Sequence, residues 1–284
     1  MKRIQYILSI LAMGGLMTGC EKDDTSPEAD IFYTVSIADK TVTFANETTG
    51  AVSYRWDFGD GESSTEESPV HTYPAKGKYV PTLYATTKDG KVTEGSTVIY
   101  IAKTSPVKLD DNTFDDWNNV TQYQLDPGAG ETFFRKVKFD YDAQYIFVYL
   151  EVNSKQSNGD IYDFYLDTDN NATTGLLTDM TGGGYDVLLE GSIFGNWWDA
   201  FNHKGAQNAF SFEPSGATEF YSIGNVEESG GVLKYEVRLV RSKLKNMAAT
   251  TAFKVGIIAT KSDWSATLGR VPGPGQPSLQ ITFE

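Results

Sequence analysis

The chain has 284 residues, of which 13% are aromatic and 27 are glycine, with a single cysteine and a formal net charge of −14 at pH 7. At about 150 residues per domain this length accommodates one or two domains, and the composition favours strands and turns over helices. The single cysteine excludes an internal disulfide, and the negative charge disfavours nucleic acid because it repels phosphate backbones. We therefore expect an acidic, all-β protein.

The N-terminus has the pattern of an export signal. Lys2 and Arg3 precede the apolar run at 4–17, and two small residues lead into Cys20. A charged region, an apolar region and small residues before the cleavage point are typical of a signal peptide. The last part resembles the lipobox of bacterial lipoproteins, which implies removal of residues 1–19 and lipidation of Cys20. The alternative is an ordinary secretory signal with an incidental thiol.

Residues 20–30 form the expected lipidated tether. Their acidic run at 21–24 resembles the short signal that directs certain Gram-negative lipoproteins to the outer face of the outer membrane. The resemblance implies a protein anchored at the cell surface through its lipid. The alternative is that this stretch is a solvated spacer, because the stretch lacks apolar residues that could fold.

The first domain is expected at residues 31–103, where short apolar alternations are separated by turn residues. Its sharpest motif is Trp-Asp-Phe-Gly-Asp-Gly at 56–61, a strand that runs directly into an Asp-Gly turn. This motif resembles the signature of PKD domains, and Pro69, His71 and Tyr73 follow at the spacing of that family. The resemblance implies an immunoglobulin-like β-sandwich that acts as a spacer or contact module without an active site.

Three further residues of this domain have expected structural roles. His71 has no neighbouring nucleophile in the sequence and is interpreted as a hydrogen-bonded structural residue, and Asp60 as a turn residue. Pro81 interrupts the strand that follows the motif. Because proline has no ladder donor, we expect this strand to lie at a sheet edge or to carry a bulge.

The second domain is expected at residues 104–284, after a polar, proline-containing linker. A hairpin is predicted around the turn at 142–144, with residues 145–152 as a central strand buried on both faces. Further strands are predicted at 161–166, 185–189, 233–239, 254–259 and 279–283.

These patterns together predict a sandwich of about eight to ten strands. The order of features, beginning with Phe-Asp-Asp-Trp at 114–117, resembles family 9 carbohydrate-binding modules and their DOMON-like relatives. The fold class we expect is therefore two β-sandwich domains in tandem, the second being larger and jelly-roll-like or DOMON-like. Trp117 is interpreted as a core anchor.

A calcium-type loop follows one of the predicted strands. Asp167, Asp169 and Asn171 stand at positions one, three and five of such a loop and offer hard oxygen ligands. The loop lacks the usual glycine and the terminal glutamate of an EF-hand, so further ligands would come from elsewhere, with Asp186 or Glu190 as candidates. The alternative is that these residues only build Asx turns between strands.

A cluster of aromatic and polar residues at 196–201 is the candidate ligand site. It lies between strand patterns, and we expect it on a loop, where aromatic rings carry recognition. Indole rings stack on the C–H faces of sugars, while nearby polar groups fix orientation. Adjacent residues on extended chain point to opposite sides, so one of the two tryptophans should be buried. The expected ligand-binding residues are Asn196, Trp197, Trp198, Asp199, Phe201 and, from a later loop, Trp264.

Catalysis has little support in the sequence. The two histidines stand in different domains and there is no thiol beyond Cys20, so the groups needed for nucleophile–base chemistry are missing. We expect a non-catalytic, surface-anchored glycan-binding protein, similar to the lipoproteins that accompany outer-membrane sugar importers. The alternatives are a carboxylate-based glycoside hydrolase and a protein-binding adhesin or assembly component.

Overall fold

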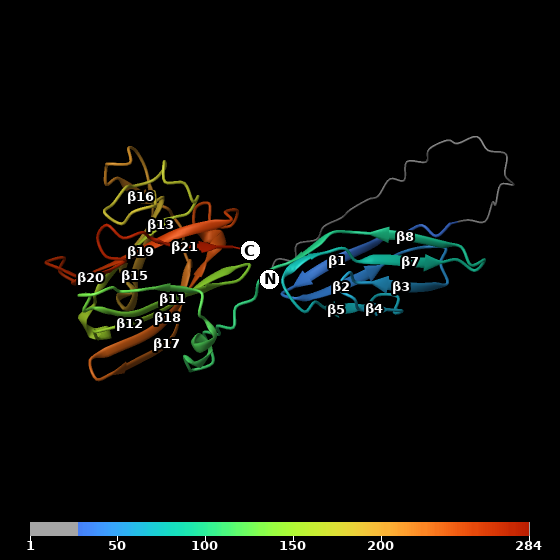
Figure 1. Cartoon of the computed structure of the whole chain (residues 1–284), viewed down its shortest axis with the longest axis horizontal. Coiled ribbons are helices and arrows are strands. Elements are labelled where there is room, and N and C mark those ends of the chain that lie inside the picture. The colour runs from blue at the N-terminus through green and yellow to red at the C-terminus, as the bar shows by residue number, and fades with distance from the viewer. Residues whose placement is uncertain (1–27, 284) are drawn as a thin grey trace. The chain divides into compact units, whose positions relative to one another are not determined.

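The computed structural model describes residues 28–283 (Figure 1). The predicted signal peptide, Cys20 and most of the tether lie outside the described residues. The chain divides into two compact units, Met1–Thr104 and Ser105–Glu284. The described residues form strands and four short 3-10 turns, which confirms the all-β fold class with two β-sandwich domains. Within 28–283, no helix has the length and apolar character needed to cross a bilayer.

The first domain consists of a three-stranded sheet of order β1-β2-β5, a four-stranded sheet of order β4-β3-β7-β8 and a ribbon of β6 and β9 (Figure 1). All pairs of neighbouring strands are antiparallel. The strands are β1 (Tyr33–Ala38), β2 (Thr41–Asn46), β3 (Ser53–Asp57), β4 (Ser63–Ser64), β5 (Val70–Thr72), β6 (Gly77–Tyr79), β7 (Thr82–Thr86), β8 (Val92–Ser96) and β9 (Ile99–Ile101).

The core of the first domain is built around the tryptophan of the sequence motif. Trp56 is fully buried, and its ring lies 4.9 Å from the rings of both Tyr33 and Phe44. These contacts join β3 to β1 and β2, so strands of the two sheets share one apolar core. Burying a side chain of this size contributes about 2–3 kcal/mol to stability.

Pro81 lies at the junction between two strands. It separates β6, which pairs with β9, from β7, which lies between β3 and β8. The expectation of an edge strand is therefore wrong for β7, which is central. The chain changes partner strands at the proline, where no ladder donor is needed, and the Pro81 carbonyl accepts the Thr97 N–H at 3.2 Å.

The second domain has two antiparallel sheets, one of five strands in the order β10-β11-β12-β18-β17 and one of order β16-β15-β14-β13-β19-β20, with β21 also paired to β19 (Figure 1). Its strands are β10 (Tyr123–Leu125), β11 (Phe134–Tyr141), β12 (Tyr145–Val152), β13 (Ile161–Asp167), β14 (Val187–Ser192), β15 (Trp197–His203), β16 (Phe212–Pro214), β17 (Tyr221–Ser229), β18 (Val232–Val240), β19 (Ala252–Thr260), β20 (Thr267–Val271) and β21 (Leu279–Thr282).

Strand β12 is buried on both faces, as its sequence predicts. Ile146 and Val148 point into the core between the two sheets, and Phe147 and Tyr149 point to the outer face of the five-stranded sheet. There they pack against Trp117, which is 2% exposed and is the expected core anchor. The segment before β10 therefore covers an apolar stripe that would otherwise face water.

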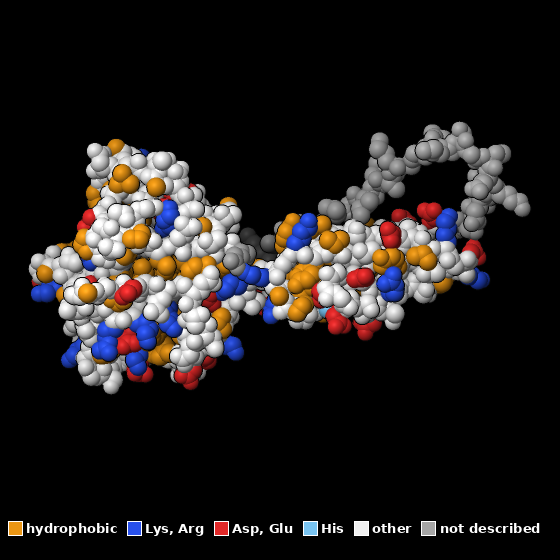
Figure 2. Space-filling model, in the orientation of Figure 1, with side chains coloured by type: hydrophobic (Ala, Val, Ile, Leu, Met, Phe, Trp, Pro, Cys, Tyr) orange, Lys and Arg blue, Asp and Glu red, His pale blue; other side chains and the backbone are white. Residues whose placement is uncertain are grey.

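The solvent-facing charges of the five-stranded sheet are of mixed sign. Figure 2 shows Lys and Arg side chains with acidic ones among them on the visible face of this domain. Arg135 pairs with Glu151 at 2.9 Å and Lys234 with Glu227 at 2.8 Å. Such exposed pairs each contribute about 0–1 kcal/mol, and their mixed signs differ from the uniformly basic stripe that binds nucleic acid.

Candidate functional site

The two adjacent tryptophans lie on β15, a strand and not the loop that the sequence predicts. Trp198 is 2% exposed, its ring meets Phe164 edge-on at 5.0 Å, and its indole N–H donates to the Tyr162 carbonyl at 3.1 Å. Trp197 points to the other side and is 43% exposed. Trp198 is therefore a core residue and cannot present a stacking face, and Trp197 is the one that reaches solvent.

The other predicted residues near Trp197 have different surroundings. Asn196 is exposed and takes a left-handed conformation at φ 58° that closes the turn before β15. Asp199 is exposed on the outer face of the strand. Phe201 is half-buried and packs against the apolar cluster that contains Leu188, so its ring supports the sheet.

Trp264 lies in the turn between β19 and β20 and is 51% exposed. Its φ of 62° is unusual for a non-glycine residue, and its N–H donates to the Lys261 carbonyl at 2.8 Å. This hydrogen-bonded turn directs the indole toward solvent. Trp197 and Trp264 are the two tryptophans among the described residues of this domain that reach solvent.

Three turns meet at one end of the larger sheet. A β-carbon added to Gly159 would lie 3.6 Å from the Ser262 β-carbon and 4.0 Å from the Ser192 hydroxyl oxygen. Gly159 ends the turn before β13, Ser192 begins the turn before Trp197, and Ser262 belongs to the turn of Trp264. The structure therefore brings the turns of both exposed tryptophans to the same end of the domain.

A cavity of about 270 Å³ lies at this end. Its wall combines two apolar side chains with amide, hydroxyl, carboxylate and ammonium groups. The lining residues are Phe133, Asn153, Ser154, Asn158, Asp160, Lys261, Ser262, Asp263 and Leu268.

Asp160 is the most buried charged residue of the cavity, at 8% exposure. Burial raises the pKa of its carboxyl, and a short hydrogen bond from the Ser154 hydroxyl to Oδ2 opposes that rise. Asn158 donates its amide N–H to the same hydroxyl at 3.1 Å, which directs its carbonyl oxygen elsewhere. These contacts position two acceptor groups at the cavity.

Reasoning from the sequence missed this cavity. Its residues come from four separate segments, at 133, 153–160, 261–263 and 268. The polar run at 153–160 between two apolar strands was the available signal, but it is equally typical of a plain turn.

A row of carboxylates crosses the outer face of the same sheet. Asp163 on β13 stands opposite Glu190 on β14, which stands opposite Asp199 on β15. Burial, and to a lesser extent the negative charge of Glu190, raises the pKa of Asp163 to about 7. Burial also raises the pKa of Glu190. Within 28–283, Oδ1 of Asp163 is buried without a hydrogen-bond partner.

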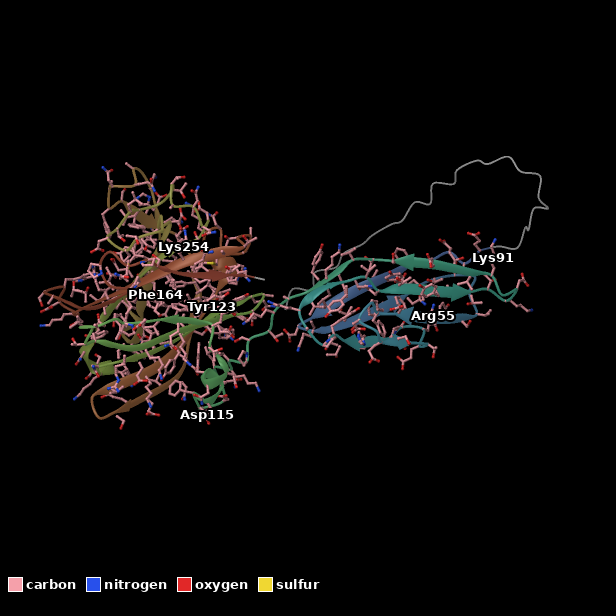
Figure 3. The ribbon with its side chains drawn as sticks, viewed as in Figure 1. Arg55, Lys91, Asp115, Tyr123, Phe164 and Lys254 are labelled. Carbon is pink, nitrogen blue, oxygen red and sulfur yellow. The ribbon has the colours of Figure 1, made fainter. Side chains whose placement is uncertain are left out.

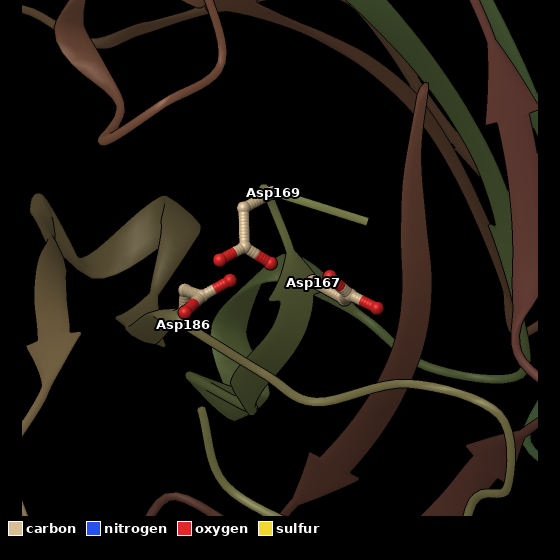
Figure 4. A group of neighbouring side chains, drawn as sticks. All are labelled: Asp167, Asp169 and Asp186. Carbon is tan, nitrogen blue, oxygen red and sulfur yellow. The ribbon is translucent and has the colours of Figure 1, made fainter. Parts of the chain in front are cut away.

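The predicted calcium loop brings two of its carboxylates close to Asp186, one of the two further candidate ligands. Carboxylate oxygens of Asp167, Asp169 and Asp186 lie within 4.8 Å of one another, and Figure 4 shows the carboxylates of Asp169 and Asp186 directed toward each other. Asn171 lies beside them: its backbone N–H donates to Oδ1 of Asp167 and of Asp169 at 3.0 Å, and its side-chain oxygen accepts the backbone N–H and the hydroxyl of Thr173 at 3.1 and 2.7 Å.

The three carboxylates of this cluster differ in their charged and hydrogen-bonded neighbours. Oδ2 of Asp167 lies 3.3 Å from the Lys254 ammonium, a residue labelled in Figure 3, and also accepts the Gly184 N–H at 3.3 Å. Burial, followed by the charge of Asp169, raises the pKa of Asp186 to about 6. The Thr174 hydroxyl donates to both oxygens of Asp169 at 3.1 and 2.9 Å, and a cation would relieve the remaining repulsion between the Asp169 and Asp186 carboxylates. Glu190, the other candidate ligand, belongs to the carboxylate row.

In the first domain, the histidine of the sequence motif has structural contacts. The His71 ring stacks on Phe58 at 4.0 Å, and its Nε2 lies 2.7 Å from Oδ2 of Asp60. Burial raises the pKa of Asp60, but the hydrogen bond and charge of His71 outweigh it and the pKa is lowered. Asp60 also accepts the Glu62 N–H at 3.0 Å. These contacts fix the turn of the motif.

Comparison with known proteins identifies the first domain. Residues 24–102 match the family model of the PKD domain, which confirms the resemblance. The Collagenase ColQ1 of Bacillus cereus is 39% identical over 61 residues, which are 22% of this chain and 6% of that protein. A microbial collagenase of Vibrio alginolyticus is 32% identical over 68 residues, 22% of this chain and 8% of that protein. The likeness thus extends to the PKD domain and not to the whole of either enzyme.

Two solved structures are similar to parts of the chain. The PKD1 domain of Vibrio anguillarum Epp is 25% identical and covers 27% of this chain and 95% of its own, with a TM-score of 0.26. A carbohydrate-binding module described as belonging to the β-sandwich superfamily is 12% identical and covers 76% of this chain and 92% of its own, with a TM-score of 0.30.

Proposed function

We propose that the second domain binds a neutral oligosaccharide without turnover, using the exposed indoles of Trp197 and Trp264. The observation that carries the proposal is the meeting of their two turns at one end of the larger sheet, beside a polar cavity. Trp198 is no longer part of the proposed site, because its indole is buried.

The chemistry of this end suits a sugar. Exposed indole faces provide stacking surfaces for the C–H faces of pyranose rings, and convergent amide, hydroxyl and carboxylate groups bond to hydroxyls. The net charge of −14 disfavours sulfated or uronic-acid-rich ligands.

The proposed setting is the bacterial cell surface. The lipid on Cys20 would hold the protein at the outer membrane, the PKD domain would serve as a spacer, and an outer-membrane sugar importer would be the partner. Many copies that engage one polymer gain affinity through effective concentration, so each site can be weak.

Calcium is proposed as a structural ion of the second domain. Asp167, Asp169 and Asp186 would hold it, and it would neutralise their mutual repulsion. No contribution to sugar chemistry is assigned to it.

A glycoside hydrolase is the second candidate function, and one observation favours it. Asp163, with a pKa of about 7, stands across the sheet from Glu190, and glycosidases use one protonated and one ionised carboxyl group. Protein binding through the PKD domain is the third candidate.

The test is a glycan-array and affinity-gel screen of residues 21–284, with an assay of the same samples for new reducing ends. We expect binding without release of reducing ends, and at least a tenfold loss of affinity in Trp197→Ala or Trp264→Ala. The control is Phe210→Ala, since Phe210 is 64% exposed and lies near the opposite end of β15. Release of reducing ends that Asp163→Asn abolishes would replace the proposal by the hydrolase, and absence of any glycan binding would favour a protein partner.

A further inference from the structure

We infer that the 270 Å³ cavity is a pocket for a single neutral pyranose ring, and that Asp160 is the group that bonds to its hydroxyls. This inference rests on the proposed function, because it names the part of the sugar-binding end that selects the ligand.

The cavity has the size and the apolar floor for one ring. Its 270 Å³ is slightly below the lower end of about 300 Å³ for pockets that enclose drug-sized ligands. Phe133 is 5% exposed and Leu268 is half-buried, so the two provide a fixed apolar wall. A pyranose ring has C–H groups on one face that pack on such a wall while its hydroxyls point to the rim.

The polar groups of the cavity mostly accept hydrogen bonds. Asp160 is 8% exposed, and its Oδ2 accepts a hydrogen bond from the Ser154 hydroxyl. Oδ1 of Asp160 remains an acceptor. So does the carbonyl oxygen of Asn158, whose amide N–H donates to the Ser154 hydroxyl. A ligand with adjacent hydroxyl donors can bond to both of these acceptors.

The charge of the cavity selects against acidic sugars. Asp160 and Asp263 bring two carboxylates, and Lys261 brings one ammonium group. The charge of Lys261 acts on the neighbouring Asp263, whose pKa it helps to lower, and its ammonium group can donate to a ring or glycosidic oxygen. A uronic acid would place its carboxylate against Asp160 or Asp263, where like charges repel.

The cavity adjoins the turn that carries one of the proposed stacking indoles. Asp263 lines it, and Trp264 is the next residue in the same turn. A ring in the cavity therefore places the neighbouring unit of its chain within reach of an exposed indole. The turn that holds Trp264 in its left-handed conformation positions both parts of the site.

The experiment measures affinity by calorimetry for maltohexaose, cellohexaose, xylohexaose and mannohexaose, with oligogalacturonate as the acidic comparison. Ser262→Phe fills the cavity from an exposed position and should leave folding unchanged. Ser265→Phe is the matched control, because Ser265 is exposed in the same turn but does not line the cavity. Asp160→Asn keeps the shape and removes the charge.

We expect Ser262→Phe and Asp160→Asn each to lower the affinity at least tenfold for whichever neutral hexaose the wild type binds. Ser265→Phe should lower that affinity less than twofold. Oligogalacturonate should bind to the wild type more weakly than that hexaose. Full affinity in Ser262→Phe, together with a loss in Trp264→Ala, would overturn the pocket and leave the proposed function standing. Binding of none of the five probes by the wild type would overturn both. A melting temperature for each variant separates loss of affinity from loss of folding.

Discussion

The indole N–H of Trp117 donates to Oε2 of Glu236 at 2.7 Å, and both side chains are buried. Oε1 of the same carboxylate accepts the Asn225 N–H at 3.0 Å. We expect Trp117→Phe to destabilise the second domain by about 2–3 kcal/mol, because it leaves a buried carboxylate oxygen without its donor. Urea unfolding followed by tyrosine fluorescence and circular dichroism measures this.

A double-mutant cycle separates the hydrogen bond from the lost ring volume. Glu236→Gln removes the charge that requires a donor, so Trp117→Phe should cost less in that background than in the wild type. Equal costs in both backgrounds would mean that Trp117 acts through packing against Tyr149 alone.

Truncation of the two adjacent tryptophans of β15 should change the stability of the domain by very different amounts. Trp198→Ala removes a core ring and is expected to cost about 3–5 kcal/mol, whereas Trp197→Ala at an exposed position should change stability by about 0.5 kcal/mol or less. Thermal unfolding of the two variants measures the contrast. Comparable losses in both would contradict the burial of one and the exposure of the other.

Strand alternation predicts that one of these two residues is inside, but the sequence of β15 alone does not say which. The choice depends on β14, whose register places Trp197 opposite Ser192 and Trp198 opposite Gly191. The order of the sheet, which is a long-range property, therefore decides which indole can meet a ligand.

Local motifs were predicted from the sequence most accurately. The turn at 56–61 and strand β12 are fixed by residues close together in the chain, and the structure places both as expected. Asp186 belongs to the acidic cluster although it follows Asp169 by 17 positions in the chain, and the residues of the cavity come from four separate segments. Sequence spacing cannot report such contacts, because they depend on which strands become neighbours.

Asp163 predicts a pH dependence of stability. Its pKa is raised from 3.8 to about 7 in the folded protein, so the folded state holds a proton that the unfolded state has lost between about pH 4 and pH 7. Stability should therefore fall as pH rises through this window. At about 1.4 kcal/mol per pH unit, the decrease is at most on the order of 4 kcal/mol.

Asp163→Asn is the variant that isolates this contribution. Because the amide cannot ionise, the difference in unfolding free energy between variant and wild type should favour the variant increasingly from pH 4.5 to 8. Urea unfolding at intervals across this range measures it. A difference that does not change with pH would show that Asp163 titrates in the folded state as it does in the unfolded chain.

Calcium is expected to stabilise the second domain through the acidic cluster. A ligand present at ten times its dissociation constant contributes about 1.4 kcal/mol, so 1 mM Ca²⁺ should raise the melting temperature by a few degrees relative to EDTA. Asp186→Asn removes one of the repelling carboxylates, so we expect it to raise the melting temperature in EDTA. Because the same change removes a calcium ligand, we expect it also to abolish the increase in melting temperature that calcium gives. Asp263→Asn, an exposed carboxylate outside the cluster, should keep the full increment. An increment that survives Asp186→Asn would place the calcium elsewhere in the chain.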